Sequence, residues 1–130
     1  MIACSNVAKK RFVPAVENSS FARISFVASR DPEKASSFAS EINCDLSGSY
    51  DDAFASDEVD AVYVSTPITE KKDLVIKAIE SSKHMIIEKP AFTSLSDAEE
   101  IIQRSGAAGL HVIEGWMFKH HPQHAVFRNE

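Results

Sequence analysis

Two short polar sequences are the parts of this chain best placed to do chemistry. The sequence Ser-Thr-Pro at 65–67 follows the apolar run 59–64, and Glu-Lys-Pro at 88–90 follows the apolar run 85–87. If both runs are strands of one parallel sheet, both polar sequences lie at the same edge, where sheets of this kind bind ligands. The proline after Lys89 restricts the backbone of that lysine, which holds its ammonium group near the strand end. The alternative is an ordinary surface lysine that forms a salt bridge beside a turn proline.

One strand–helix–strand unit, residues 59–90, positions these polar sequences. The start of this unit is almost continuously apolar and rich in residues that favour strands, as in a strand buried on both faces. Apolar residues then recur at helical spacing over 74–79, and the charged residues from Lys71 onward are assigned to the other faces of that helix. Thr66 is predicted to cap this helix, with Pro67 in its first turn. The connection between the two strands is predicted to be right-handed.

Strands and helices are predicted to alternate along the whole chain. The predicted strands lie at 1–4, 21–29, 44–46, 59–64, 85–87 and 110–113, and the predicted helices at 6–16, 32–42, 51–55, 67–80 and 94–109. The last helix is predicted to begin at Ser94 or at Ser96, because Ser96 and Glu99 are spaced as in a capping box. It is predicted to end at Gly106 or Gly109. This order predicts the α/β class and a Rossmann-like, doubly wound parallel sheet that forms a single domain.

Composition and residue spacing exclude several classes of protein. The 130 residues are enough for one domain with a core, and the fractions of 44% hydrophobic and 25% charged residues are ordinary for a globular protein. The net charge of −5 argues against general nucleic-acid binding, and no apolar run reaches the roughly 18–20 residues of a membrane span. Cys4 and Cys44 lack a CxxC spacing, so two reduced thiols in a cytoplasmic protein are expected. His120 and His124 are spaced like two metal ligands on a helix, but Pro122 disrupts that helix, and no metal site is predicted.

Four stretches together resemble the N-terminal half of the Gfo/Idh/MocA family of oxidoreductases, which includes glucose–fructose oxidoreductase and inositol dehydrogenase. The most specific are Ser-Thr-Pro at 65–67 and Lys-His-Met-Ile-Ile-Glu-Lys-Pro at 83–90, which match the TP and GKHV…EKP motifs of the family. Residues 2–12 are similar to its first strand, glycine loop and helix, and residues 28–35 to the end of its second strand. Residues 114–122 resemble its E-x-x-M-x-R-x-H-P segment. Within the family, the chain looks most like the xylose and dihydrodiol dehydrogenase type.

The resemblance implies a domain that binds NAD or NADP during hydride transfer between the nicotinamide and a sugar or polyol carbon. Lys89 is then the catalytic lysine, whose ammonium group steers the proton of the substrate hydroxyl and stabilises a developing alkoxide. Glu88 and Pro90 would fix the strand end, while Thr66 and Pro67 would line the nicotinamide side. The implied cofactor-binding residues are Ser5, Asn6, Val7, Ser29, Arg30, Ser65, Thr66, Pro67, Glu88, Lys89 and Pro90. The implied partner is a small sugar or polyol, and a homo-oligomer is compatible with the resemblance.

The end of the second predicted strand indicates which cofactor is preferred. An acidic residue there favours the ribose 2′-hydroxyl of NAD, whereas an arginine favours the 2′-phosphate of NADP. Ser29 and Arg30 occupy these positions, and a hydroxyl beside a guanidinium group suits a phosphate. NADP is therefore predicted over NAD. Asp31 would reverse this preference if its carboxylate reached the ribose.

The chain departs from the family pattern at the glycine loop. The fingerprint G-x-G-x-x-G/A appears as Ala-Cys-Ser-Asn-Val-Ala at 3–8. Ala3 is expected to place a Cβ where the tight turn needs positive φ. Ser5 replaces the glycine that lets the backbone approach the pyrophosphate, so weaker binding is expected, with a hydrogen bond from its hydroxyl as compensation. Lys71 stands where the family has a histidine, and Lys119 stands where it has an arginine, which loses a bidentate fork.

The resemblance also predicts how the chain is divided. Residues 1–122 are predicted to form the NAD(P)-binding domain, and residues 123–130 to begin the second domain, which supplies the substrate pocket and the partner of the lysine. The chain alone is therefore expected to be a truncated enzyme without dehydrogenase turnover. The alternatives are a non-catalytic nucleotide-binding or interaction remnant, favoured by the loss of both glycines, and a decayed reading frame. A thermal shift with NADP would separate these alternatives, because a ligand that binds only the native state raises the melting temperature.

Overall fold

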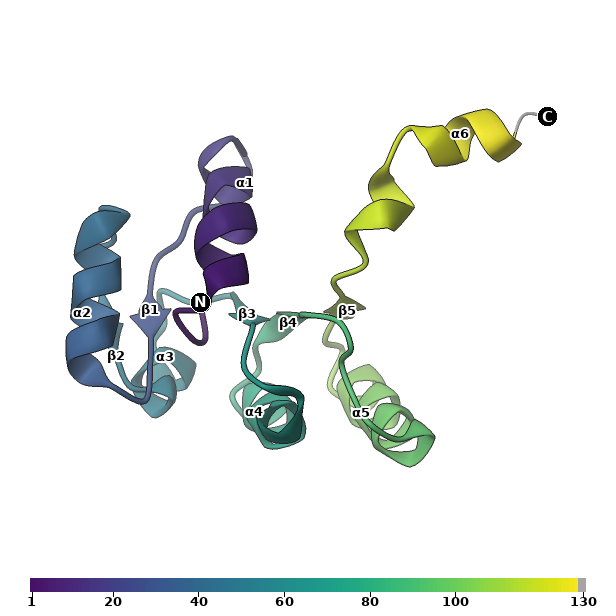
Figure 1. Cartoon of the computed structure of the whole chain (residues 1–130). Helices are drawn as coiled ribbons and strands as arrows, with labels where there is room; N and C mark the ends of the chain where they lie inside the picture. Colours follow the sequence, from purple (N-terminus) through teal and green to yellow (C-terminus); the bar gives the residue numbers. More distant parts are fainter. Residues whose placement is uncertain (129–130) are drawn as a thin grey trace.

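The computed structural model describes residues 1–128 and contains a sheet of parallel strands (Figure 1). The strands are β1 (Val27–Ala28), β2 (Ser47–Gly48), β3 (Ala61–Val64), β4 (His84–Ile87) and β5 (Val112–Glu114). Ile2 forms single parallel bridges to Ala28 on one side and to Val64 on the other, so the spatial order is β2, β1, Ile2, β3, β4, β5. The first residues therefore lie at the centre of the sheet, and the chain builds outward first to one side and then to the other.

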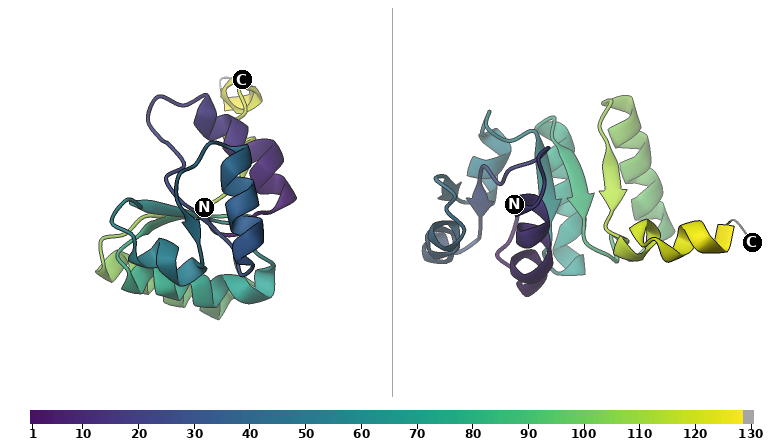
Figure 2. Two further views of the ribbon diagram at one scale, coloured as in Figure 1. Left: turned by 90° about the vertical axis from the view of Figure 1, so that its left-hand side faces the viewer. Right: turned by 90° about the horizontal axis from the view of Figure 1, so that it is seen from above.

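Helices cover both faces of this sheet (Figures 1 and 2). The first helix has a π-helical part, η1 (Ala8–Phe12), and an α-helical part, α1 (Val13–Glu17). The others are α2 (Pro32–Glu41), α3 (Tyr50–Ala55), α4 (Ile68–Glu80), α5 (Leu95–Ala107), the 3₁₀ helix η2 (Met117–His120) and α6 (Gln123–Arg128). The first helix and α2 pack on one face, and α3, α4 and α5 pack on the other. The predicted doubly wound α/β architecture is therefore confirmed.

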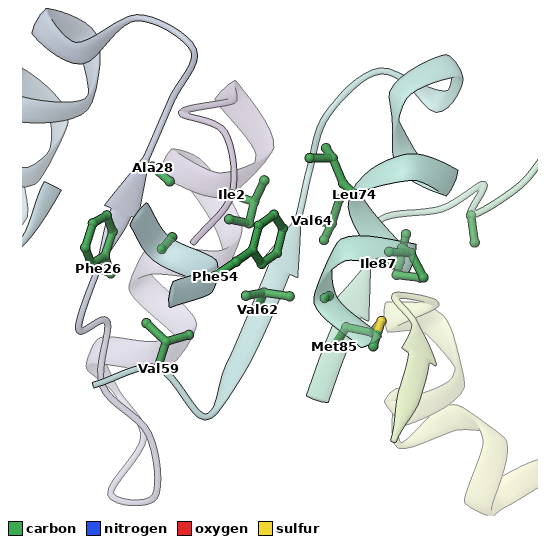
Figure 3. Packing of buried hydrophobic residues seen from close by; sticks show 14 of the residues in the cluster. Ile2, Phe26, Ala28, Phe54, Val59, Val62, Val64, Leu74, Met85 and Ile87 are labelled. Atoms are coloured by element: carbon green, nitrogen blue, oxygen red, sulfur yellow. The ribbon is translucent and has the colours of Figure 1, made fainter. Parts of the chain in front are cut away.

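The larger hydrophobic core lies between the sheet and the layer of α3, α4 and α5 (Figure 3). Ile2, Val62 and Val64 reach this core from the centre of the sheet, and Phe54 of α3 lies beside them. Ile2 and Val64 are fully buried. Full burial of a side chain of this size contributes about 1.5–3 kcal/mol, so this core fixes the strands whose ends carry the polar sequences.

A smaller core lies on the opposite face, under the first helix and α2. Side chains alternate between the faces of a strand, and Tyr63 points to this side, where its ring stacks on Phe12 with centroids 3.8 Å apart. Ile86 and Ile113 are in register with Tyr63 and share its face. They are 37% and 53% exposed, so residues 1–128 leave this side of β4 and β5 largely uncovered.

Two of the predicted strands have different bounds in the structure. The strand predicted at 21–29 is paired only at β1, because its neighbour β2 is too short to pair with the residues before Val27. Phe21, at the start of that predicted strand, is 98% exposed. The short strand predicted at 44–46 lies instead at β2, because the ladder with β1 begins where Val27 meets Ser47.

The ends of α5 are set by Ser94 and Gly109. The Ser94 hydroxyl accepts a hydrogen bond from the Asp97 N–H at 3.1 Å, so Ser94 is the N-cap and the capping box expected from Ser96 does not form. At the other end, Gly109 has φ +68, and its N–H donates to the carbonyl of Gly106. This left-handed residue ends the helix as the sequence predicted.

Two predictions about α4 are wrong. The helix begins at Ile68 with Pro67 as its N-cap, and Thr66 makes no capping hydrogen bond. Lys71 does not face solvent, because it is only 3% exposed. Its spacing from the buried apolar positions 74, 75 and 78 puts it on the same face of the helix. Hydrogen bonds to backbone carbonyls, described below, compensate for the burial of its charge.

The segment after β5 extends away from the sheet (Figures 1 and 2). None of the residues of η2 and α6 is buried, and Trp116, Met117 and Phe118 are exposed. Within residues 1–128, no helix is both long enough and apolar enough to cross a membrane. Residues 129–130, the last part of the predicted segment 123–130, lie outside the described residues.

Candidate functional site

The predicted site residues all lie at the edge of the sheet formed by the carboxyl ends of its strands. They are Ser5, Asn6 and Val7 after the central bridge, Ser29 and Arg30 after β1, Ser65, Thr66 and Pro67 after β3, and Glu88, Lys89 and Pro90 after β4. The N–H of Glu88 donates to the carbonyl of Val64 at 2.9 Å, so the turns after β3 and β4 are neighbours. This is the edge at which doubly wound sheets bind ligands.

The loop after Ile2 has the backbone conformation of a glycine loop without the first glycine. Ala3 has φ 73, in the left-handed region, and its N–H donates to the carbonyl of Ala28 at 2.9 Å. The left-handed conformation costs an alanine roughly 1–2 kcal/mol relative to the right-handed one. The expectation of positive φ at Ala3 is therefore confirmed, and the surrounding sheet holds this strain.

The Ser5 hydroxyl is engaged within the chain. It donates to the Ser65 hydroxyl at 2.8 Å and accepts from the N–H of Ala8 at 3.1 Å. The Ser65 hydroxyl lies 3.3 Å from the carbonyl of Ile2, to which it donates. Ser5 thus bonds to the first residue of η1 and ties the loop to the end of β3. A hydrogen bond from this hydroxyl to a phosphate, the compensation expected from the sequence, requires the bond to Ser65 to break.

The start of the first helix offers backbone donors. The first N–H groups of a helix have no carbonyl partner inside it, which makes a helix N-terminus an anion site in nucleotide-binding folds. The N–H groups of Ala8 and Lys9 already bond to the hydroxyl and the carbonyl of Ser5. Asn6 and Val7 precede them, and the Asn6 residue is exposed. Their N–H groups are the ones placed to meet a phosphate at this end.

Arg30 has an acidic neighbour that the sequence did not indicate. Its guanidinium group lies 3.0 Å from a carboxylate oxygen of Glu70, which belongs to the first turn of α4. Ser29 is buried and accepts from the N–H of Asp31 at 3.2 Å. The Asp31 carboxylate accepts from two N–H groups in the first turn of α2, so it serves as the helix cap. Of the two charged residues at this strand end, Asp31 caps α2, whereas the side chain of Arg30 extends into solvent.

Thr66 carries a polar atom without a partner. The residue is 6% exposed, and its hydroxyl has no hydrogen-bond partner among the described residues. An unsatisfied buried polar group is costly, and in native proteins it often marks a place for a ligand or an ordered water molecule. Thr66 lies between β3 and α4, next to Ser65, whose hydroxyl bonds to Ser5. A polar ligand group at this edge would satisfy it.

The turn that carries Lys89 is fastened by Lys71. The Lys71 ammonium group donates to the carbonyl of Glu88 and, at 2.7 Å, to the carbonyl of Pro90. Lys89 lies between these two residues, and its own side chain is exposed. The backbone on both sides of the predicted catalytic lysine is thus held from α4.

Two further contacts fix the same turn. A Glu114 carboxylate oxygen accepts from the N–H of Ala91 at 2.8 Å, which ties the turn to the end of β5. The Tyr63 hydroxyl donates to a carboxylate oxygen of Glu88 at 2.7 Å. Burial, with the Glu88 carboxylate as a smaller cause, raises the pKa of Tyr63, so this hydroxyl keeps its proton for Glu88.

Four contributors to this edge were not singled out from the sequence as site residues: Tyr63, Glu70, Lys71 and Glu114. Tyr63 and Glu114 stand on strands next to the predicted sequences, and Glu70 is three residues after Pro67. Of these four, only Lys71 could have been found from the sequence, because its helical spacing from the apolar positions of α4 predicts that it is buried. For the others, the partner lies far away in the sequence. Within residues 1–128, no group of three or more His, Cys, Asp and Glu side chains is placed to hold a metal ion.

A comparison with protein families identifies the family of this chain. The model of the oxidoreductase family with an NAD-binding Rossmann fold, Gfo/Idh/MocA, matches residues 1–115. The chain belongs to the Gfo/Idh/MocA family. The predicted family and its Rossmann-like fold are therefore confirmed, and the chain is the NAD-binding part of such an oxidoreductase.

Relatives of known activity in the Gfo/Idh/MocA family cover the chain almost completely. It is 33% identical over 129 residues to a dTDP-3,4-didehydro-2,6-dideoxy-alpha-D-glucose 3-reductase from Saccharopolyspora spinosa, covering 99% of this chain and 39% of that protein. It is 30% identical over 123 residues to D-xylose 1-dehydrogenase (NADP(+)) 2 from Haloferax volcanii, covering 94% and 38%. The predicted likeness to xylose dehydrogenases is found, together with a likeness to dTDP-sugar reductases that the motifs did not indicate. The chain spans about two fifths of the length of these relatives.

A solved structure shows the same fold as this chain. KijD10, a 3-ketoreductase from Actinomadura kijaniata in complex with NADP and TDP-benzene, matches with a TM-score of 0.93 and 31% identity. The match covers 98% of this chain and 39% of KijD10.

The residues at the carboxyl edge fit a dinucleotide. The left-handed backbone at Ala3 keeps the turn of the family's loop, and the first helix presents its N–H groups beyond it. The buried Thr66 hydroxyl has no hydrogen-bond partner among the described residues, so a polar group of the cofactor could bond to it. The fit is weakest at Ser5, whose side chain replaces a glycine and is bonded to Ser65.

Proposed function

We propose that the chain binds NADP at the carboxyl edge of its sheet and contributes the cofactor side of a hydride transfer to or from a sugar or alcohol carbon. The observation that supports this most is the gathering of three features at one edge. They are the left-handed loop at Ala3, the buried and unpartnered Thr66 hydroxyl, and the fastened turn that carries Lys89.

Each part of the edge has a role in this proposal. The N–H groups of Asn6 and Val7 hold the pyrophosphate at the helix N-terminus. Ser29 and Arg30 hold the 2′-phosphate, for which a guanidinium fork is well suited. Residues 65–67 line the nicotinamide end. Ser65, Glu88 and Pro90 act by holding the loop and the turn in place, because each already bonds within the chain.

Lys89 is the proposed catalytic residue. Bound NADP supplies the nicotinamide carbon that accepts or donates the hydride. The ammonium group of Lys89 hydrogen-bonds the substrate oxygen and gives it a proton when the carbon is reduced. When the alcohol is oxidised, the neutral amine of Lys89 receives the hydroxyl proton and becomes an ammonium group. A fixed positive charge there also stabilises the developing alkoxide. The exposed side chain of Lys89 at the rim is consistent with this role.

Four observations support NADP over NAD. Arg30 reaches outward at the strand end, and Asp31 is occupied as the cap of α2. Among the relatives, the Haloferax volcanii enzyme is an NADP(+) xylose dehydrogenase, and the matched KijD10 structure contains NADP. The Arg30–Glu70 pair opposes phosphate binding only weakly, since an exposed ion pair contributes about 0–1 kcal/mol.

The proposal extends to the organisation and the substrate. Residues 1–122 form the cofactor domain, and the segment from residue 123 begins a second domain that supplies the substrate pocket. The substrate is a sugar or a polyol, either free or attached to a nucleotide, since the relatives include a xylose dehydrogenase and dTDP-sugar reductases.

A second candidate is a non-catalytic remnant of such an enzyme. The strain at Ala3 and the internal bonds of the Ser5 hydroxyl favour this alternative, because both weaken a phosphate site.

Calorimetric titration of the chain with NADPH and with NADH separates these candidates. We expect NADPH to bind at least about tenfold more tightly, because a charge-assisted hydrogen bond contributes about 1.5–3 kcal/mol and 1.4 kcal/mol is tenfold in affinity. No binding heat with either ligand at millimolar concentration would support the remnant. Tighter binding of NADH would keep the dinucleotide site and overturn the choice of cofactor.

A further inference from the structure

Lys71 is buried in a place where its charge has a specific use. It is 3% exposed, in the first turns of α4, and its ammonium group reaches the turn after β4. There it donates to the carbonyls of Glu88 and Pro90, the residues immediately before and after Lys89. One side chain therefore binds the carbonyls of the two residues that flank the proposed catalytic lysine.

An ammonium group suits this position better than an apolar side chain. Carbonyl oxygens that point into a protein interior need donors, and a lysine has three donors on one atom. Burial lowers the pKa of Lys71, while the carboxylates of Glu88 and Glu114 counteract part of that effect. The buried charge is thus met by two carbonyls and two nearby acidic residues, as a stable buried cation requires.

The other contacts of the turn do not replace this bridge. The Glu114 carboxylate holds the N–H of Ala91, and the Tyr63 hydroxyl holds the side chain of Glu88. Neither touches the carbonyls on the two sides of Lys89. Without the Lys71 ammonium group, the peptide groups around Lys89 would be fixed only at the ends of the turn.

We propose that Lys71 is a positioning residue that holds the backbone on both sides of Lys89 and so sets where the Lys89 ammonium group stands. Lys71 acts through the two carbonyls and does not touch the substrate. The inference deepens the proposed function, on which the catalytic role of Lys89 rests. The bridge itself is a property of the chain without cofactor and can be measured in that state.

Amide hydrogen exchange on the Lys71→Met variant tests this inference. Methionine keeps the length and the apolar stem and removes the donors. We expect the amides of Glu88 and Ala91, which donate hydrogen bonds in this turn, to exchange at least about tenfold faster than in the unchanged chain, while amides of α2, on the other face of the sheet, keep their rates. The ¹H–¹⁵N signal of Lys89 is expected to move, because its flanking carbonyls lose their donor.

Two further variants make the result specific. Lys72→Met removes the neighbouring lysine, which lies in ion pairs with Asp97 and Glu100, and is expected to leave the turn unchanged. Lys71→Arg keeps the donors and is expected to restore exchange at Glu88 and Ala91 to within about threefold and to return the Lys89 signal toward its original position. If Lys71→Met does not fold, Lys71→Gln, which keeps one amide donor group, is expected to show the same local loosening to a smaller degree.

Unchanged exchange at Glu88 and Ala91 in Lys71→Met, or in Lys71→Gln where it is needed, would overturn the inference. Equal acceleration throughout the chain, without rescue by arginine, would also overturn it, because Lys71 would then act only on overall stability. These measurements use no cofactor. Failure of NADPH to bind would therefore refute the proposed function separately, while unchanged exchange with NADPH binding intact would refute only the role of Lys71.

Discussion

Replacing Ile2 with alanine is expected to lower the free energy of unfolding by about 3 kcal/mol, because shortening a buried aliphatic side chain leaves a cavity. Ile2 is fully buried and lies beside Phe54 in the larger core (Figure 3). Its N–H donates to the carbonyl of Tyr63 at 2.8 Å and its carbonyl accepts from the N–H of Ser65 at 3.2 Å, which ties it to β3. On the β1 side, the neighbouring Met1 carbonyl and Ala3 N–H each bond to Ala28 at 2.9 Å, so Ile2 lies where the two halves of the sheet meet. The same residue supports the loop at Ala3, so the candidate site loosens with the fold.

Urea unfolding measures this loss, with Ile102→Ala as the matched control. Ile102 lies on α5 and is 68% exposed, so its replacement is expected to change the free energy of unfolding by less than about 0.5 kcal/mol. A loss below about 1 kcal/mol for Ile2→Ala, or a loss equal to that of the control, would contradict the central place of Ile2 in the sheet.

Replacing Arg30 with alanine is expected to weaken NADPH binding by about 30-fold, within the range of one or two charge-assisted hydrogen bonds. NADH lacks the 2′-phosphate, so its affinity is expected to stay within about twofold of the unchanged chain. Arg30 is exposed and forms its ion pair with Glu70 at the surface, which makes an effect on folding small. Calorimetric titration of the variant with both ligands measures the two affinities.

Glu70 and Arg23 provide controls for that result. Glu70→Gln removes the carboxylate that competes for Arg30, and is expected to tighten NADPH binding a few-fold. Arg23 is also an exposed arginine in an ion pair, with Glu58, but it precedes β1 and lies at the opposite edge of the sheet. Arg23→Ala is expected to leave both affinities unchanged. Equal losses of affinity for NADPH and for NADH in Arg30→Ala would show that Arg30 does not bind the 2′-phosphate.

The sheet could be predicted because its strongest signals are local. The apolar run at 59–64 and the helix after it form a continuous pattern, and the structure places β3, α4 and β4 there. The short strands were harder to predict, because pairing depends on a neighbour. β1 could not extend to Phe21, since β2 offers only two residues for pairing. The sequence around Phe21 contains no sign of that limit.

The candidate site was predictable as a set of positions and much less as a set of contacts. The polar sequences at 65–67 and 88–90 lie at one edge, as parallel strands require. The hydrogen bond from Ser5 to Ser65 joins residues sixty positions apart, so spacing along the chain could not indicate it. The outward position assigned to Lys71 was wrong, because its charge was given more weight than its spacing. A buried lysine needs oxygen partners, and those partners come from the turn at 88–90.

The central claim is that a dinucleotide binds at the edge where the loop after Ile2 meets the turns after β3 and β4. Titration of ¹⁵N-labelled chain with NADPH tests this most directly, because each amide reports its own surroundings. The amides of Asn6, Val7, Thr66 and Lys89 are expected to shift together along one saturating curve. Shifts confined to the opposite edge, in the depression around Phe21, Arg23 and Glu58, or no shifts at millimolar NADPH, would contradict the claim.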